Sequence, residues 1–274
     1  MRRTIELAFV LFVTSVAVVK CDGAQIDFES GNDSSFMHYD PLAQVGGTPA
    51  SYTINQAAYA NYGPSNHVYD IFDPASTVDP AYGPSRAGSL LEGEIYYSQF
   101  YAAVDLVTWE TSHDEALGLL ARITNPGLGT TDGYALTYSV GSTEIDLTRI
   151  DDESPTNLAL TKLPALTPGH GYRLVFTGNG DLLTGQVFDD ADLSAPLATI
   201  TATDSTYGSG YSGLIVFDNT LSPATNGADA TFDNYADGAS LPEPASAGAF
   251  VLAASLLLRR RRLGSRLLWN YRFR

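Results

Sequence analysis

The chain has 274 residues, of which 44% are apolar and 17% are charged. This apolar content is enough for a folded core in one sizeable domain, or at most two, and it excludes wholesale disorder. The formal net charge of −16 argues against nucleic-acid binding, which needs a basic face.

The charge is divided unevenly along the chain. Residues 25–240 hold 28 of the 31 acidic residues but only five of the 15 basic ones, a formal charge of −23. Three basic residues (Arg2, Arg3 and Lys20) precede this stretch, and seven lie in the last sixteen residues, which contain no acid. The ends and the middle therefore belong to different environments.

Residues 1–24 have the organisation of a secretory signal peptide. Arg2 and Arg3 precede an apolar run over residues 7–19, and the small residues Gly23 and Ala24 follow it. We expect cleavage after Ala24, within a few residues. A buried N-terminal helix and a lipoprotein signal at Cys21 are the alternatives, although Lys20 stands where a lipoprotein signal needs a small residue. Cys21 is the only cysteine, so cleavage leaves a mature chain that is stabilised without disulfides.

Residues 25–237 are predicted to form one acidic all-β domain. Alternating apolar and polar runs are separated by Gly, Pro, Asn and Asp, and no long segment has helical periodicity. The predicted strands comprise residues 99–109, 116–124, 133–140, 143–149, 157–163, 171–177, 182–189, 197–203, 212–217 and 230–235. Residues 26–28 supply a first strand that pairs with the last. Residues 36–95 are interpreted as long loops and short strands laid on this body.

Ten or eleven short strands with brief turns predict a two-sheet, jelly-roll-like β-sandwich. The segment 171–219, "GYRLVFTGNGDLLTGQVFDD" through "TITATDSTYGSGYSGLIVFDN", resembles concanavalin A-like or laminin-G-like jelly rolls of bacterial surface proteins. The resemblance covers about a fifth of the chain and implies a fold often used for glycan recognition. A fold alone does not decide function.

The sharpest candidate for catalysis is Glu144-Ile145-Asp146. On a strand, residues 144, 146 and 148 point to one face. The segment resembles half of the E-[ILV]-D-x-x-E motif of laminarinase-like retaining glycosidases, which use two carboxyl groups about 5–5.5 Å apart. Leu147, Thr148 and Arg149 supply no second Glu, so we interpret the segment as a solvated strand face with Asp151, Asp152 and Glu153 just beyond it. No G-x-S-x-G elbow is present, and the four histidines have no zinc-ligand spacing.

Calcium is a candidate structural cofactor, because carboxylate and carbonyl oxygens are its preferred ligands. Glu29 follows the first predicted strand and Asp233 lies in the last, so strand pairing would bring them together. The opening "DFESG" (27–31) resembles the structural calcium position of carbohydrate-binding jelly rolls. Asp189, Asp190 and Asp192 form a second candidate group. The alternative for all of them is a set of turn-stabilising Asp side chains.

Aromatic side chains are candidate platforms for sugars. Tyr207 and Tyr211 lie in a small-residue loop, and further tyrosines occur at positions 59, 62, 69 and 82. Most tyrosines at this density are expected to pack on the sandwich with the hydroxyl outward.

The C-terminal segment is predicted to be a sorting signal. Pro242-Glu243-Pro244 precedes the apolar residues 245–258, which span about 21 Å as a helix, and then come Arg259, Arg260, Arg261 and Arg262, which would hold that end in the cytoplasm. This order resembles the PEP-CTERM sorting signal, which implies recognition by an exosortase-type membrane protease. We divide the segment into a signal with a short transmembrane helix over 238–262 and a basic cytoplasmic tail over 263–274. A plain tail anchor is the alternative.

The sequence therefore predicts an exported, surface-sorted protein of the cell surface or extracellular matrix. Its predicted role is non-catalytic and includes binding of extracellular polysaccharide. The alternative is a glycoside-active enzyme with an unrecognised site on the same fold.

Overall fold

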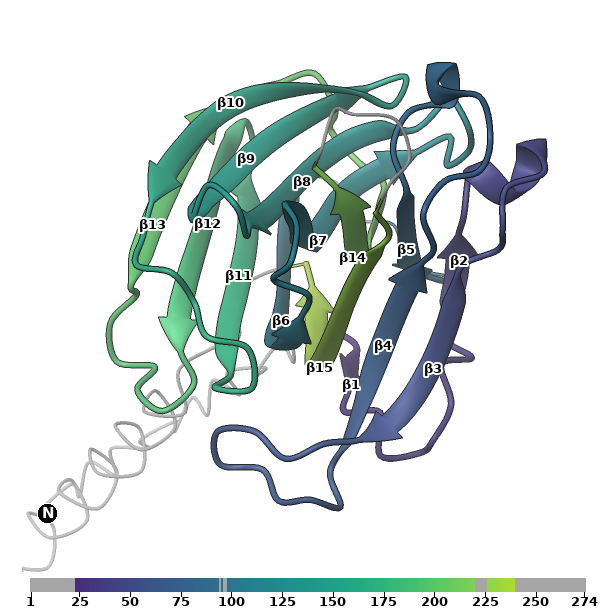
Figure 1. Ribbon diagram of the computed structural model, residues 1–274. Helices are drawn as coiled ribbons and strands as arrows, with labels where there is room; N and C mark the ends of the chain where they lie inside the picture. Colours follow the sequence, from purple (N-terminus) through teal and green to yellow (C-terminus); the bar gives the residue numbers. More distant parts are fainter. Residues whose placement is uncertain (1–22, 94, 96–97, 220–225, 240–274) are drawn as a thin grey trace, which may run out of the picture.

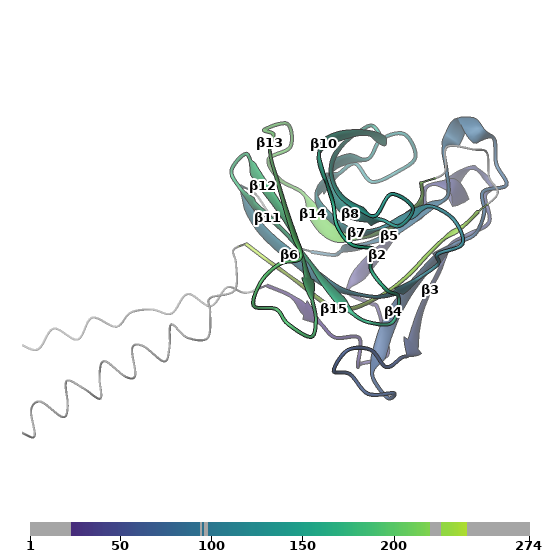
Figure 2. The ribbon, with the colours of Figure 1, turned by 60° about the vertical axis from the view of Figure 1, so that its left-hand side comes forward.

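The computed structural model describes residues 23–93, 95, 98–219 and 226–239, which form a sandwich of two antiparallel β-sheets (Figure 1). Figure 2 shows the strands as two curved layers. The predicted all-β, two-sheet architecture is confirmed. The predicted signal and sorting segments, with Pro242, Glu243, Pro244 and the four arginines, lie outside the described residues. Within the described residues no helix is long and apolar enough to cross a membrane.

The eight-stranded sheet has the order β13-β12-β11-β6-β15-β4-β3, with β1 paired to β15. Its strands are β1 (Gln25–Ile26), β3 (Ser51–Gln56), β4 (His67–Asp73), β6 (Gln99–Trp109), β11 (Tyr172–Asn179), β12 (Leu182–Asp189), β13 (Ala198–Thr203) and β15 (Ala228–Gly238). The predicted pairing of the first strand with the last is confirmed, with Gln25 opposite Ala236 and Ile26 opposite Tyr235.

The seven-stranded sheet has the order β10-β9-β8-β7-β14-β5-β2. Its strands are β2 (Phe36–Tyr39), β5 (Arg86–Leu91), β7 (Glu115–Thr124), β8 (Asp132–Ser139), β9 (Glu144–Asp151), β10 (Ser154–Lys162) and β14 (Tyr211–Asp218). Two short 3-10 helices, Leu42–Val45 and Pro80–Tyr82, lie in the loops.

The main core fills the space between the sheets, because every second residue of each strand points inward. In β11 the inward residues Leu174 and Phe176 are buried, and in β8 so are Tyr134 and Leu136. Aromatic contacts join the layers, such as the edge-on packing of Trp109 and Tyr138 with ring centroids 5.8 Å apart. Burial of this core stabilises a fold that contains no disulfide among its described residues.

The expectation for residues 36–95 was wrong in one respect. This stretch supplies β2 and β5 to one sheet and β3 and β4 to the other, so it completes both sheets rather than lying on them. The strand segments in this stretch are short and interrupted by Gly and Pro, so the alternation of apolar and polar residues is hard to recognise in the sequence. Their pairing partners are distant in sequence: β4 pairs β15, and β5 pairs β14.

Candidate functional site

The outer face of the seven-stranded sheet carries a second hydrophobic cluster, which we call the outer apolar cluster. It consists of Tyr39, Leu90, Leu120, Ile123, Ala135 and Ile215, all of them buried. These side chains point away from the main core, since their strand neighbours Leu91, Leu119 and Leu214 point into it. Strand alternation alone would leave this outer face exposed to solvent, but its side chains are buried.

Glycines on this face allow the strands to approach closely. Ile215 lies between Gly88 and Gly118 in the strand register. A Cβ at Gly118 would lie 2.2 Å from the carbonyl oxygen of Leu136, and one at Gly88 would lie 2.4 Å from that of Leu214. Only glycine fits at these two positions, which indicates a tightly rolled sheet.

A polar clamp bridges the same face. The carboxylate of Glu153, in the β9–β10 turn, accepts hydrogen bonds from Arg86 Nε (2.9 Å) and Nη2 (2.8 Å). It also accepts bonds from the Tyr39 hydroxyl and the Gly129 amide. Burial alone would raise the pKa of Glu153, but these donors lower it below its usual value. Because β2 and the β9–β10 turn belong to opposite sides of the sheet, this Glu153 clamp closes the outer face.

The half-motif of the glycosidases lies on this closed face. Ile145 and Leu147 are in the main core, so Glu144 and Asp146 point to one face, as predicted, but this face is largely buried rather than solvated. Asp146 is buried and accepts a hydrogen bond from Ser139 Oγ at 2.6 Å. Burial, together with the nearby charges of Glu144 and Asp114, raises the pKa of Asp146.

The outer face of the eight-stranded sheet is built differently. At its centre a hydrogen-bonded group, which we call the Tyr59 cluster, comprises Tyr59, Asn66, Asp105, Arg173, Asp233 and Asn234. Asp105, Arg173 and Asp233 are cross-strand neighbours on β6, β11 and β15. The loop between β3 and β4 lays Tyr59 and Asn66 over them.

Each carboxylate in the Tyr59 cluster has donors. The Tyr59 hydroxyl lies 2.9 Å from Asp233 Oδ2 and 3.1 Å from Asp105 Oδ2. Arg173 Nη1 donates to Asp105 Oδ1 at 2.7 Å. Burial raises the pKa of Asp233 to about 6, an effect opposed by the hydrogen bonds from Asn66 and Asn234. Burial likewise raises the pKa of Asp190, beside the cluster, to about 7, and the charge of Asp105 adds to this.

Tyr62 covers this cluster. Its ring stacks on Tyr59 with centroids 4.8 Å apart, and the residue is 40% exposed. Burial and the charges of Asp105 and Asp233 raise the pKa of its hydroxyl. Tyr62 is thus a half-exposed aromatic side chain held above a polar floor.

Beyond a small apolar cluster that includes Val175 and Phe188, strands β11, β12 and β13 present a set of uncharged polar side chains, which we call the threonine face. Its members are Thr177, Thr184, Gln186, Thr199, Thr201 and Thr203. The strand register aligns Thr177, Thr184 and Thr201 in one row, and Gln186 and Thr199 in the next. Neighbouring strands lie about 4.8 Å apart, so the hydroxyls form a regular array. The three β13 threonines are exposed, and Ile200 between them is buried in the main core.

The structure gives the two predicted calcium ligands separate partners. Glu29 accepts bonds from the His67 amide and ring, both at 2.9 Å. Asp233 accepts bonds from Tyr59, Asn66 and the Asn234 amide. All four carboxylate oxygens face N–H or O–H donors, so this arrangement does not form a calcium cage. Within the described residues no three His, Cys, Asp or Glu side chains group as metal ligands.

In the second predicted acidic group, two of the three carboxylates stabilise turns. Asp189 accepts a bond from the Ala191 amide at 2.8 Å, and Asp192 accepts one from the Ser194 amide at 3.0 Å. This is the alternative that the sequence left open.

The two predicted sugar contacts lie on different sides of the seven-stranded sheet. Tyr207 packs against the main core, and its hydroxyl lies 2.7 Å from Asp151 Oδ1 and 3.1 Å from Asp132 Oδ1. Tyr211 packs against the outer apolar cluster. The structure therefore does not bring them together as one platform.

The Tyr59 cluster and the Glu153 clamp were not predicted as sites. Both join residues more than 60 positions apart, such as Arg86 and Glu153 or Tyr59 and Asp233. No local pattern reports such contacts. The threonine face had a local signal, the alternation in "TITAT" over 199–203, but its array depends on the pairing of three strands.

No protein-family model matches the sequence, and no curated protein does. Several solved structures share the fold. A lectin, UEA-II in complex with galactose, has 11% identity and a TM-score of 0.50, covering 80% of this chain and 98% of its own. A family 7 alginate lyase, A1-II′, has 8% identity and a TM-score of 0.50, covering 77% and 98%. The carbohydrate-binding module CBM66 from Bacillus subtilis has 16% identity and a TM-score of 0.46, covering 70% and 97%. At these identities the likeness concerns the fold alone.

Proposed function

We propose that this protein is an exported, non-catalytic polysaccharide-binding protein of the cell surface or extracellular matrix. Its binding surface is the outer face of the eight-stranded sheet, which carries the threonine face, Tyr62 and the Tyr59 cluster. Lectins and carbohydrate-binding modules share this fold, which makes the proposal compatible with known use of the architecture.

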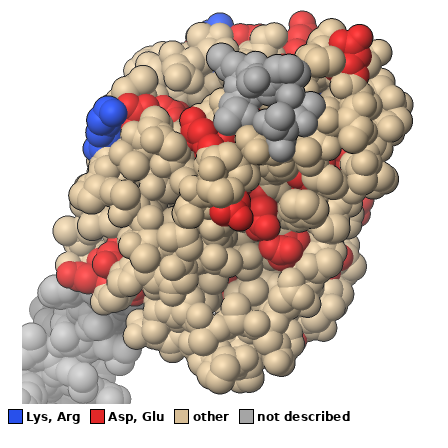
Figure 3. Space-filling model, in the orientation of Figure 1, with Lys and Arg blue, Asp and Glu red and all other residues tan. Residues whose placement is uncertain are grey.

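The observation that carries the proposal is the uncharged threonine face in a strongly acidic body. Figure 3 shows one face of the molecule, on which acidic side chains cross the middle and the few basic ones lie at the edge. Within this acidic body, Thr177, Thr184, Gln186 and the β13 threonines carry no charge. Hydroxyl and amide groups both donate and accept hydrogen bonds, as sugar hydroxyls do. They also make contact without the desolvation of a charge.

The same reasoning selects the ligand class. A formal charge of −23 over residues 25–240 repels anionic polymers. The threonine face extends over three strands as an array rather than a pocket, which suits an extended chain better than a single sugar. We therefore propose a neutral, extended polysaccharide as the ligand.

A glycan array probed with the exported protein, with and without EDTA, tests this function. We expect binding to neutral polysaccharides that EDTA does not abolish, because the carboxylates of Glu29 and Asp233 already have donors. Binding to no glycan under either condition would contradict the proposal.

The alternative, a glycoside-active enzyme, has one observation in its favour: Asp146 is a buried carboxyl with a raised pKa beside Glu144 and Asp114. An alginate lyase shares the fold. Release of new reducing ends from any polysaccharide of the array, lost in Asp146→Asn, would establish this alternative in place of the binding role.

Export and sorting belong to the same proposal. The signal peptide directs export, and an exosortase-type enzyme acts at Pro242-Glu243-Pro244, with Arg259 to Arg262 as the membrane stop. Replacing the three motif residues by alanine should prevent processing. Unchanged processing and location would contradict the sorting role.

A further inference from the structure

Two hydrogen bonds join the beginning and the end of the described sandwich, at Ala24 and Asp237. The Ala24 amide donates to the carboxylate Oδ1 of Asp237 at 3.1 Å, and the Asp237 amide donates to the Ala24 carbonyl oxygen at 3.0 Å. This contact extends the pairing of β1 with β15 by one residue beyond Gln25. The backbone nitrogen of residue 24 is therefore held at a carboxylate.

The Asp237 carboxylate is buried and oriented. The residue is 4% exposed, and its Oδ2 accepts a hydrogen bond from Ser212 Oγ at 2.6 Å. Ser212 Oγ in turn accepts one from the Tyr235 hydroxyl at 2.8 Å. This chain of hydroxyls fixes the carboxylate, and Oδ1 is the atom that it presents to residue 24.

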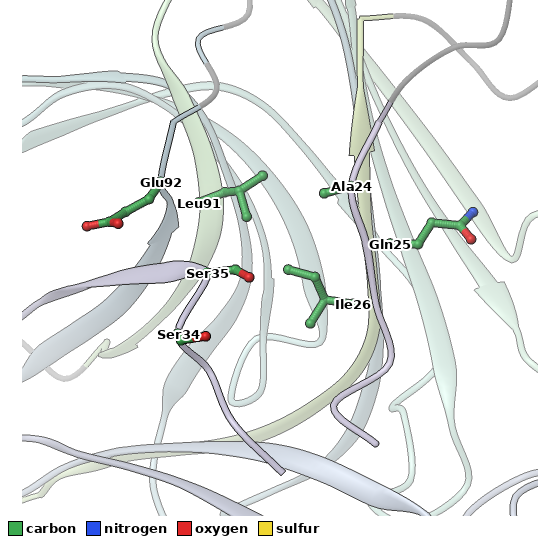
Figure 4. Close-up of a pocket in the computed structure, with 7 residues that line it drawn as sticks. All are labelled: Ala24, Gln25, Ile26, Ser34, Ser35, Leu91 and Glu92. Carbon is green, nitrogen blue, oxygen red and sulfur yellow. The ribbon is translucent and has the colours of Figure 1, made fainter. Parts of the chain in front are cut away.

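The backbone at Gly23, the residue before Ala24, packs closely against the backbone of Asp237. A Cβ at Gly23 would lie 1.7 Å from the Asp237 carbonyl oxygen, so only glycine fits there. On the other side, Ala24 borders a pocket of about 460 Å³ that is also lined by Ile26, Ser34, Leu91 and Glu92. Figure 4 shows the side chains of Ala24 and Ile26 directed toward Leu91, while Gln25 points away. Residue 24 thus stands between the pocket and Asp237.

The sequence places a cleavage signal at this point. Signal peptidases require small residues at the last and third-last positions of the leader. Cleavage after Gly23 puts Gly23 and Cys21 in those positions. Cleavage after Ala24 would put Asp22 in the third-last position, and it would remove the residue that pairs with Asp237.

We infer that the leader is removed after Gly23 and that the new α-ammonium group of Ala24 is captured by the carboxylate of Asp237. Hydrolysis of the Gly23–Ala24 peptide bond by water leaves a carboxylate on the leader and an ammonium group on Ala24. An ammonium–carboxylate hydrogen bond is stronger than the amide–carboxylate bond it replaces. Capture anchors β1 to β15, the last strand before the sorting segment. This inference rests on the export part of the proposed function and is independent of glycan binding.

The first test is the mass of the exported protein. Expression of the full chain with its own leader should yield a first residue of Ala24. A first residue of Gln25 or later overturns the inference while leaving export intact. Retention of Met1 in every cellular fraction overturns export as well, so the two failures are distinguishable.

The second test is a cycle of variants. The exported chain is prepared with either Ala24 or Gly23 as first residue, each with Asp237 or Asp237→Asn. We expect the substitution to raise the unfolding equilibrium constant about tenfold more in the Ala24 form, because only that form loses an ion pair. Asp229→Asn, on the same strand, is the matched control and should act equally in both forms. An equal effect of Asp237→Asn in both forms overturns the inference.

If Asp237→Asn does not fold, the α-amine itself reports on capture. The rate at which an amine-reactive reagent labels the first residue should be several-fold lower in the Ala24 form than in the Gly23 form. Equal rates overturn the inference without use of any Asp237 variant.

Discussion

The two outer faces of this sandwich are both built from alternating strand residues, but they differ in how far these residues are buried. Alternation sends every second residue of each strand outward, which normally leaves an outer face to solvent. On the seven-stranded sheet the outward residues form a second core under the Glu153 clamp. On the eight-stranded sheet Tyr101, Ala103, Val175 and Ala236 form only a small outward cluster, and the edge strand β13 presents exposed threonines. The comparison teaches that strand pattern alone does not decide whether an outer face is available to a ligand, because side chains and loops can bury the outward residues.

The physical basis of the difference lies in particular residues. Gly88 and Gly118 let the strands of the seven-stranded sheet approach, and Arg86 and Glu153 bridge its two sides. The threonine face has β-branched threonines at its outward positions, which favour the strand conformation, and those of β13 are exposed.

The largest effect is expected from breaking the clamp. Arg86→Ala leaves the carboxylate of Glu153 buried without its bidentate partner, so the free energy of unfolding should fall by about 3 kcal/mol. Urea denaturation measures the change. The matched control is Lys162→Ala, which removes an ion pair with Glu144 in which the lysine side chain is 74% exposed. That variant should change stability by less than about 0.5 kcal/mol. Equal effects would show that the clamp does not close the face.

A somewhat smaller effect is expected from the outer apolar cluster. Leu120→Ala removes a buried side chain from the outer face of the seven-stranded sheet, so stability should fall by about 2–3 kcal/mol. Leu182→Ala, at a 48% exposed position on the outer face of the other sheet, should change it by about 0.5 kcal/mol or less. If the two variants behave alike in urea denaturation, the two faces do not differ in burial.

The two outer faces should contribute to the pH dependence of stability with opposite signs. The pKa of Glu153 is lower in the folded protein than in the unfolded chain. The clamp therefore stabilises the folded state at neutral pH, and this stabilisation is lost as the pH falls. The pKa values of Asp233 and Asp190 are raised to about 6 and about 7. Their folded forms bind protons more tightly than the unfolded chain, so their contribution is lost as the pH rises through 4 to 7.

Variants test that difference directly. Asp190→Asn should flatten the decline of stability between about pH 4 and pH 7, whereas Glu153→Gln should reduce the loss below about pH 5. Asp192→Asn, at an exposed turn position where hydrogen bonds from Ser194 lower the pKa of the carboxylate, is the control and should leave the slope between about pH 4 and pH 7 unchanged. Profiles with the same slope change in Asp190→Asn and Glu153→Gln would contradict the assignment.

Much of the sandwich follows from sequence, because β6 to β14 are long alternating runs between clear turn residues. The strands Gln99–Trp109 and Leu182–Asp189 have the predicted bounds. The strands β2 to β5 could not be placed, since their partners lie far away in the chain. Glu153 was expected on a solvated face, but a contact with Arg86, 67 residues away, buries it. Tyr207 was predicted as a sugar contact, but its hydroxyl is hydrogen-bonded to Asp132 and Asp151.

The central claim is that the threonine face binds a neutral polysaccharide, and it is tested most directly by removing hydroxyls without changing shape. Thr184→Val, Thr199→Val and Thr201→Val keep the β-branched side chains and can be combined in one protein. Thr156→Val, at an exposed position on β10 of the other sheet, is the control. Affinity electrophoresis in a gel that contains the neutral polysaccharide selected by the array measures the dissociation constant. The account predicts that the triple variant binds at least about tenfold more weakly while the control binds like the wild type. Unchanged binding by the triple variant would contradict it.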